Sequence, residues 1–271
     1  MSLQALVSNS ALAGTGPYHL RIARLEDAPT LYALKAQAFG DSYLLYTIYQ
    51  APQSVRYLAR MVTEAPKQSG QGLFVIEQDG QIRGYYHAIC RTAQYFLNYI
   101  AVAQEAERLG LGSILLRHFE EAGKDIGCQM LALDVFDSNP SVRDWYYRHG
   151  YRLTDASFHI RLAMGALMGD GAPLLCQQDA LVRALAEEEA WGFSKLACQC
   201  GSGRLTVGLI AGHACKLLDY SGLSVENAAS AIASRFRGER KVLIISALPD
   251  LPSGWPVLSS EKVLRLGKAI E

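Results

Sequence analysis

Residues 99–112, YIAVAQEAERLGLG, decide how this chain is interpreted, and the segment SILLRHFEEAGK follows them directly. A short run of β-branched and apolar residues leads to Gly110 and Gly112, and these two glycines open an amphipathic helix. The first N–H groups of a helix have no partner within the helix, and the helix dipole attracts anions to that end. The stretch therefore predicts a backbone cradle for a pyrophosphate group.

Composition narrows the classes of protein to consider. The chain has 271 residues, enough for two domains, and half of its residues are hydrophobic. Its formal net charge is zero, which gives no support to binding of nucleic acid or of an anionic membrane. No apolar run reaches about 18 residues, and the N-terminal segment lacks the basic start of a secretion signal. We expect a cytoplasmic protein with no nucleic-acid or membrane partner.

The cysteines raise the question of a metal site. All six are scattered through the chain, mostly in apolar segments, which favours small buried thiols in a reducing compartment. Cys198, Cys200, His213 and Cys215 are residue types that bind zinc. A hairpin that turns just after Cys200 places His213 about 30 Å away along the second strand. We expect no metal site. The alternative left open is that the second strand bends back and closes the gap between His213 and Cys200.

The first part of the chain predicts a mixed α+β unit. Asp79-Gly80 lies between two strand-like runs and is a strong hairpin signal. Gly150 has the usual position just after the end of a helix. The remaining predicted elements are strands at 18–24, 94–102, 130–136 and 151–164, and helices after Asp27 and at 54–63, 111–124 and 141–148.

A glycine-rich patch, MGALMGDGAP, separates this unit from the rest of the chain. We expect two domains, residues 1–165 and 166–271. The second contains no nucleophile elbow, P-loop or metal motif. Its predicted elements are a helix at 179–190, a hairpin at 193–219, a helix at 224–236, a strand at 241–247 and a last short helix or strand.

The two glycines admit a dinucleotide-binding interpretation, which the surrounding residues disfavour. That fingerprint needs a third glycine, and position 115 is Leu. It also needs an acidic residue about 20 residues further on, which Asp134 supplies only loosely. The strands before the glycines are expected to be antiparallel, unlike those of a dinucleotide fold.

Three motifs follow one another along the first unit. Val102 ends an apolar strand, and Gly110 and Gly112 follow it by eight and ten residues. The next buried strand reads LDV at 133–135 and is followed four residues later by Asn139. In the last motif, Asn139 is followed by Val142, Trp145 and Tyr146, and then, after three residues, by Gly150 and Tyr151.

Together, these motifs make residues 18–162 resemble the GNAT superfamily of acyl-CoA-dependent N-acyltransferases. The resemblance implies an α+β fold with a mixed, mostly antiparallel central sheet flanked by helices, and acetyl-CoA as co-substrate without a metal. It implies an N-acetyltransferase that acts on a small-molecule or peptide amine by direct attack in a ternary complex. The coenzyme A residues that it implies are Ile100, Ala101, Val102, Arg108, Leu109, Gly110, Leu111, Gly112, Ser113 and Asn139.

Tyr146 is the catalytic residue that the resemblance implies, as a donor to the departing thiolate. A phenol has a pKa near 10 and a thiol one near 8.5, so a positioned O–H stabilises the thiolate without a strongly downhill proton transfer. The alternative to this catalytic role is that Tyr146 is a structural residue whose ring packs on the sheet. Glu107 departs from the family, which has Gln or Arg at this position. Its carboxylate is expected to repel a pyrophosphate. Arg108 is the neighbouring residue that can compensate.

Deprotonation of the acceptor amine has no single candidate in the sequence. Asp134, Tyr99, His87 and Glu77 are the residues considered, and a histidine on a strand is more often structural. Four tyrosines on the early helices are available either for an aromatic-lined acceptor pocket or for core packing. They are Tyr43, Tyr46, Tyr49 and Tyr57.

The second part of the chain repeats the order of the first, with a helix, a hairpin, a helix and a strand. It lacks the paired glycines and the Asn-to-Tyr signature. We expect a smaller α+β domain, either a degenerate half-copy of the same fold or an unrelated appendage. The alternative function is a non-catalytic acyl-CoA-binding or sensing protein. Three questions are left open: which acyl group is transferred, which amine accepts it, and whether the protein forms a homodimer.

Overall fold

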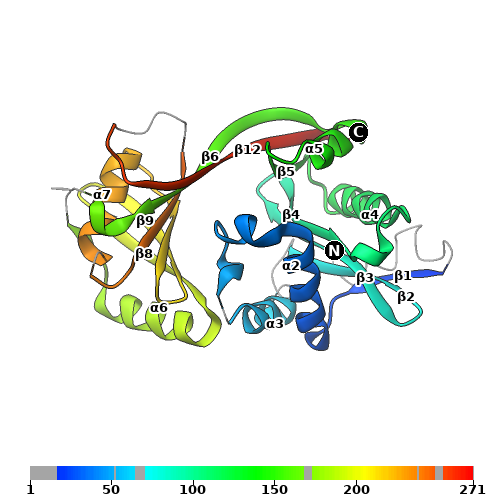
Figure 1. Ribbon diagram of the computed structural model, residues 1–271, viewed down its shortest axis with the longest axis horizontal. Coiled ribbons are helices and arrows are strands. Elements are labelled where there is room, and N and C mark those ends of the chain that lie inside the picture. The colour runs from blue at the N-terminus through cyan, green and yellow to red at the C-terminus, as the bar shows by residue number, and fades with distance from the viewer. Residues whose placement is uncertain are drawn as a thin grey trace.

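The structure is a computed structural model, and it describes residues 17–51, 53–64, 71–167, 173–236, 238–247 and 253–270. Within these residues, twelve strands form one continuous sheet in the order β1-β2-β3-β4-β5-β12-β6-β11-β10-β9-β8-β7. Helices pack on the sheet around two large hydrophobic clusters. We call β1 to β6 with their helices the N-terminal unit, and β7 to β11 with theirs the C-terminal unit (Figure 1).

The N-terminal unit begins with four antiparallel strands, and the Asp79-Gly80 hairpin is confirmed. Asp79 and Gly80 have φ angles of 52° and 73°, which are typical of a tight type I′ turn. The strand predicted at 94–102 has these same bounds. The four strands are β1 (Tyr18–Ile22), β2 (Gln71–Gln78), β3 (Gln81–Arg91) and β4 (Gln94–Val102).

Helices cover both faces of this part of the sheet, because neighbouring residues of a strand point to opposite faces. On β3, the ring of Tyr86 contacts His118 and Phe119, which belong to α4 (Leu111–Asp125). The next residue, His87, stacks on Tyr99, whose ring meets that of Phe39 on α2 (Ala28–Leu44). The other elements on the α2 side are η1 (Leu25–Asp27), η2 (Ile48–Gln50) and α3 (Ser54–Glu64).

Strands β4 and β5 (Met130–Phe136) separate shortly after they meet. They are parallel, and they pair only where residues 94–97 lie beside residues 130–133. Beyond Leu97, β4 continues to pair with β3 alone. The wedge between β4 and β5 is bordered by η4 (Gln104–Ala106), the start of α4 and α5 (Pro140–Arg148).

The C-terminal unit repeats this topology. Three antiparallel strands, β8, β9 and β10, lead through α7 to β11, which is parallel to β10, just as β2, β3 and β4 lead through α4 to β5. The second domain and the mixed sheet flanked by helices are therefore as expected. The elements are β7 (Leu174–Leu175), α6 (Gln178–Trp191), β8 (Phe193–Cys200), β9 (Gly203–Ile210), β10 (Ala214–Asp219), α7 (Val225–Phe236) and β11 (Val242–Ala247).

Two details of the C-terminal unit differ from the prediction. The segment expected as one hairpin at 193–219 forms three strands, because a second turn at 211–213 follows the first. The expected short last element is a long strand, β12 (Val257–Ala269). It leaves the unit to which the sequence analysis assigned it and inserts between β5 and β6 (Arg152–Ala163).

The two units exchange strands. β6 pairs with β11 of the C-terminal unit, and β12 pairs with β5 of the N-terminal unit. β6 and β12 also pair with each other and run as two long ribbons from one unit to the other (Figure 1). The alternating apolar residues Leu264 and Leu266 of β12 complete the N-terminal core, which explains why this strand has a fixed register there.

Candidate functional site

The wedge between β4 and β5 contains a cavity of about 480 Å³. The N–H and C=O groups of residues 98–102 have strand partners on the β3 side only, so this edge of β4 is available to an extended ligand. The opposite wall comes from β5 and α5, and α2 closes one end. The lining residues include Phe39, Tyr43, Asn98, Tyr99, Ile100, Ala101, Val102, Glu107, Gly112, Asp134, Phe136, Asn139, Val142, Trp145 and Tyr146.

The start of α4 lies at the other end of this cavity. Gly110 is the N-cap of the helix with a φ angle of 79°, a conformation that favours glycine. Gly112 lines the cavity, and a Cβ atom there would lie 3.6 Å from the ring of Trp145, in ordinary contact. Ser113 Oγ and His149 Nε2 are 3.1 Å apart, which ties α4 to the end of α5.

The residues expected to bind coenzyme A fall into two groups. Ile100, Ala101, Val102, Gly112 and Asn139 all line the cavity. The remaining five are on the segment that leads into α4 but are not among its lining residues. Of these, Leu111 is buried in the core, and the N–H groups of Leu109 and Ser113 bond to the carbonyls of Ala106 and Gly110. Asn139 is the N-cap of α5, where its Oδ1 accepts the Val142 N–H at 3.3 Å.

Tyr146 lies in the wall of the cavity and is buried. Burial, and next to it the neighbouring Tyr43, raises the pKa of Tyr146 far above its usual value. Its hydroxyl therefore keeps its proton and is available as a hydrogen-bond donor at ordinary pH. Glu107, the acidic residue in the pyrophosphate segment, is exposed and also lines the cavity.

The four residues considered for deprotonation have different surroundings. Asp134 lines the cavity, but Arg265 of β12 binds both of its oxygens, with Nη2 2.9 Å from Oδ2. Burial, together with the charges of Lys35 and Arg91, lowers the pKa of His87 to about 3, so its ring is neutral. Tyr99 keeps its proton because burial raises its pKa. Glu77 pairs with Arg21 and lines neither this cavity nor the one described next.

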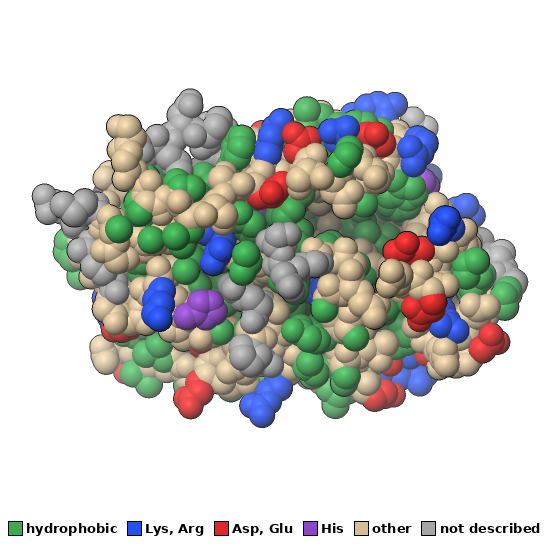
Figure 2. All heavy atoms as spheres, in the orientation of Figure 1, with side chains coloured by type: hydrophobic (Ala, Val, Ile, Leu, Met, Phe, Trp, Pro, Cys, Tyr) green, Lys and Arg blue, Asp and Glu red, His purple; other side chains and the backbone are tan. Residues whose placement is uncertain are grey.

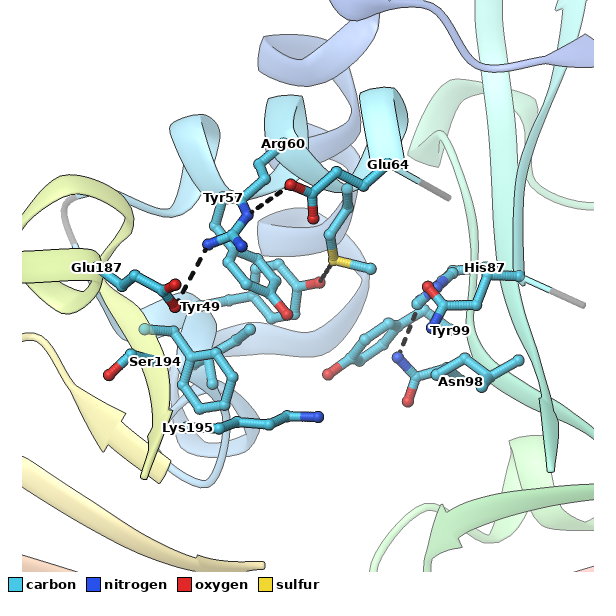
Figure 3. Close-up of a pocket in the computed structure, with 15 residues that line it drawn as sticks. Tyr49, Tyr57, Arg60, Glu64, His87, Asn98, Tyr99, Glu187, Ser194 and Lys195 are labelled. Carbon is cyan, nitrogen blue, oxygen red and sulfur yellow. Dashed lines mark hydrogen bonds and ion pairs between the residues drawn. The ribbon is translucent and has the colours of Figure 1, made fainter. Parts of the chain in front are cut away.

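A second cavity, of about 320 Å³, lies between the two units (Figure 3). We call it the inter-unit cavity, and it shares Asn98 and Tyr99 with the first. The N-terminal unit lines it with residues of η2, α3, β2, β3 and β4, and the C-terminal unit with residues of α6 and β8. Its lining residues are Ile48, Tyr49, Tyr57, Arg60, Met61, Glu64, Gln71, His87, Ile89, Asn98, Tyr99, Glu187, Phe193, Ser194 and Lys195.

The four tyrosines of the early helices are divided between these places. Tyr43 lines the first cavity, and Tyr49 and Tyr57 line the second. Tyr46 packs against Phe136 and His159 at the contact between the units. Lys35 lies among them fully buried, with Nζ 2.7 Å and 3.3 Å from the ring centres of Tyr99 and Tyr49.

Sequence reasoning missed the inter-unit cavity. Arg60, Glu187 and Lys195 come from α3, α6 and β8, so no local spacing connects them. The partner of Asp134 was missed for the same reason, since Arg265 is 131 residues away in the chain. Only pairing of the last strand with β5 brings it near.

The cysteines were considered above as metal ligands. In the described part of the chain, no group of three or more His, Cys, Asp and Glu side chains is placed to hold a metal ion. Cys198 and Cys215 pack in the core of the C-terminal unit, while His213 is at the second turn.

No helix among the described residues is both long and apolar enough to cross a membrane. Figure 2 shows basic and acidic side chains interspersed over one face.

Part of this chain is similar in sequence to one known protein family. The model of the acetyltransferase (GNAT) family matches residues 42–151. A 5-NmdU N-acetyltransferase of Pseudomonas phage PaMx11 is 34% identical over 87 residues, which are 31% of this chain and 60% of that protein. An uncharacterized N-acetyltransferase of Methanocaldococcus jannaschii is 35% identical over 80 residues, which are 29% of this chain and 51% of that protein.

The chain thus spans about half to three fifths of the length of these two curated relatives. A solved structure resembles nearly all of it. A tandem GNAT protein from the clavulanic acid biosynthesis pathway has a TM-score of 0.64 at 12% identity, and the match covers 94% of this chain and 99% of that one. At this identity the likeness is one of fold, and it includes both units.

Proposed function

Because residues 42–151 of this chain belong to the GNAT family of acetyltransferases, we propose that the protein transfers an acetyl group from acetyl-CoA to a primary amine. The observation that carries this proposal is the wedge between β4 and β5. One edge of β4 is free there to pair with the amides of an extended ligand, and the cavity runs to the start of α4. The two relatives named N-acetyltransferases support an amine as acceptor.

The chain's residues suit coenzyme A at both ends of the cavity. Gly112 faces the cavity at a helix N-terminus, where a side chain would take up room that a pyrophosphate needs. Residues 100–102 offer backbone groups rather than special side chains, which is what amide pairing requires. Glu107 opposes this fit with its negative charge, and its exposure lets solvent screen the repulsion. When bound, acetyl-CoA supplies the activated thioester.

In the proposed reaction, the amine nitrogen bonds to the thioester carbonyl carbon and the carbon–sulfur bond breaks. Tyr146 donates a hydrogen bond to the departing sulfur, and its raised pKa keeps the proton available on the phenol. The amine loses one proton and the thiol gains one. Asp134 is held by Arg265, and a pKa of about 3 makes His87 a weak base, so we assign the amine's proton to water in the cavity rather than to either side chain.

Release of free thiol tests this function. The protein is incubated with acetyl-CoA and a panel of amines, and thiol is measured with a colorimetric reagent. We expect turnover with at least one amine and none in its absence. A non-catalytic acyl-CoA sensor is the second candidate, favoured by the absence of a free base among the four residues considered. Tight binding of acetyl-CoA without turnover on any amine would establish the sensor instead.

A further inference from the structure

The inter-unit cavity is placed to receive the second substrate. It shares Asn98 and Tyr99 with the cavity that we assign to acetyl-CoA, so the two cavities adjoin at these residues. Tyr57 and Phe193 meet edge to face with ring centres 5.7 Å apart, one from each unit. This part of the wall favours an apolar or aromatic body. The C-terminal unit thus lines the cavity and does more than pack against its neighbour.

Most charges of this cavity already have partners. Arg60 Nε lies 3.0 Å from Glu64 Oε1, and Arg60 Nη1 lies 3.8 Å from Glu187 Oε2. The guanidinium also lies 5.6 Å from the ring centre of Trp191 on α6. Arg60 therefore links α3 to α6, and it is occupied with protein carboxylates.

Lys195 is the exception. Among the described residues it has no hydrogen-bond or ion-pair partner, and Figure 3 shows its side chain extending across the cavity toward the side of Tyr99 and Asn98. Its neighbour across the sheet is Gly208, which has no side chain to pair with it. The next strand carries Lys216, whose Nζ donates to the Tyr46 carbonyl at 3.0 Å. Lys195 is exposed, and its ammonium is directed into the cavity without a hydrogen-bonded or ion-paired carboxylate among the described residues.

Two buried polar atoms of the cavity's residues also lack partners. Asn98 Nδ2 donates to His87 Nδ1 at 2.9 Å, which leaves the ring proton on Nε2, and that atom has no partner among the described residues. The buried Ser194 Oγ is likewise unpaired within the described part of the chain. A buried donor without a partner is costly, and a ligand with acceptor atoms offers a partner to His87 Nε2, whereas the Ser194 hydroxyl points away from the cavity in Figure 3.

We propose that the acceptor is an amine with an apolar or aromatic body and a second, anionic group, and that Lys195 of the C-terminal unit binds that group. A carboxylate and a phosphate have the required charge and acceptor atoms in common. The inference rests on the proposed function. It makes Lys195 a residue that determines specificity and takes no part in the chemistry.

A matched pair of amines tests this inference on the full-length protein. 4-(Aminomethyl)benzoate is compared with 4-(aminomethyl)benzamide, in which the changed group is remote from the reacting amine, so that charge is the main difference. A 4-(aminomethyl)phenylphosphonate arm distinguishes a phosphate-type site from a carboxylate site. We expect the wild type to prefer an anionic member by about tenfold or more in kcat/KM, mainly through KM.

In the Lys195→Gln variant, kcat/KM on the anionic amine is expected to fall to about its value on the neutral amide, so that the preference is lost. Lys195→Arg is expected to retain it, as is the control Lys241→Gln, which removes an exposed lysine that lines neither cavity. Equal use of charged and neutral amines by the wild type, or an unchanged preference in Lys195→Gln, overturns the inference while the acetyltransferase function stands.

A binding measurement separates the two proposals. Calorimetry with 4-(aminomethyl)benzoate on the coenzyme A complex reports anion binding without turnover. Weaker binding to Lys195→Gln than to wild type, by about tenfold, supports the inference even if no amine is acetylated. Equal binding to both proteins contradicts it.

Discussion

At the scale of single residues, burial decides which chemistry a side chain can perform. Tyr146 and His87 are both buried, with opposite consequences for their use. Burial raises the pKa of the phenol, so it remains a donor, and lowers the pKa of the imidazole to about 3, so it remains neutral. Neither pKa could be obtained from the sequence, because both depend on side chains from elements far apart in the chain.

The role of Tyr146 predicts a separation of binding from turnover. In Tyr146→Phe, the ring still packs on Trp145 and Tyr151 but the donor to sulfur is gone. We expect acetyl-CoA affinity within about threefold of the wild type and a turnover more than about tenfold lower, as for loss of one catalytic donor. Calorimetry and thiol release measure the two quantities. Full turnover in the variant would make Tyr146 a packing residue.

Lys35 predicts a pH-dependent stability. Its ammonium is fully buried, and burial lowers its pKa well below the usual 10.5. The Lys35 amine therefore binds a proton more tightly in the unfolded chain than in the folded protein, which lowers the free energy of unfolding. This loss of stability is complete at a pH below the pKa in the folded protein. It disappears as the pH rises through about 10.4, the pKa in the unfolded chain. We expect Lys35→Met to be more stable than wild type by about 1–3 kcal/mol near neutral pH.

Urea unfolding at pH 6, 7.5 and 9 measures this effect. The advantage of Lys35→Met is expected to shrink toward high pH, while Lys241→Met, at an exposed position, follows the wild type throughout. A gap that does not change with pH would show that the two aromatic rings under Nζ keep it charged in the folded protein.

At the scale of elements, the start of α4 and the edge of β4 form the candidate site together. Gly110 is required for its positive φ angle, whereas Gly112 has an ordinary helical position that faces the cavity. The two glycines thus have different physical reasons to be glycine, although they belong to one motif. A substitution can separate the fold requirement from the ligand requirement.

Gly112→Ala is expected to bind acetyl-CoA at least about tenfold more weakly without loss of stability. The added Cβ meets the Trp145 ring and Val102 at ordinary contact distances, and alanine in a helix is better by up to about 1 kcal/mol. Thermal unfolding and calorimetry provide the two measurements. Gly110→Ala serves as the contrast, since its strained φ angle lowers stability by about 1 kcal/mol. Unchanged affinity in Gly112→Ala would place the pyrophosphate elsewhere.

Local patterns predicted most elements of both units. The hairpin at Asp79-Gly80, the strand 94–102 and the helix that ends before Gly150 depend on neighbouring residues, so the sequence contains their signals. The inter-unit cavity and the Asp134–Arg265 pair depend on contacts between distant segments. No periodicity or turn signal encodes these contacts, so a single sequence could not predict them. β12 was misplaced because its alternation indicates a strand without indicating its neighbours.

At the scale of the whole molecule, the exchange of β6 and β12 makes the two units depend on each other. Val263 to Ala269 pair with β5, and Leu264 and Leu266 fill the N-terminal core. The C-terminal unit receives β6 in return beside β11. Neither repeat has a complete sheet from its own continuous stretch of chain. Within the C-terminal unit, buried Arg240 and Glu188 pair at 2.7 Å, and loss of either partner would leave an uncompensated buried charge.

A chain that ends at residue 169 is therefore expected to fail as an independent N-terminal unit. Without β12, the β5 and β6 edges are left unpaired and apolar, which favours aggregation. We expect insolubility or a melting temperature at least about 10 °C lower, together with loss of acetyl-CoA binding. Solubility, thermal unfolding and calorimetry on the truncated chain test this. Unchanged stability and affinity would show that the N-terminal unit is self-sufficient.

Strand exchange also determines the order in which the protein can be completed during synthesis. Val263 pairs with Phe136, so 126 residues must be translated between the two before the contact can form. At about 5–20 residues per second this takes several seconds to half a minute, far longer than a hairpin needs to close. Until then β5, which forms one wall of the wedge, lacks its neighbour β12. The candidate site therefore acquires its last supporting strand only after the C-terminal unit has been translated.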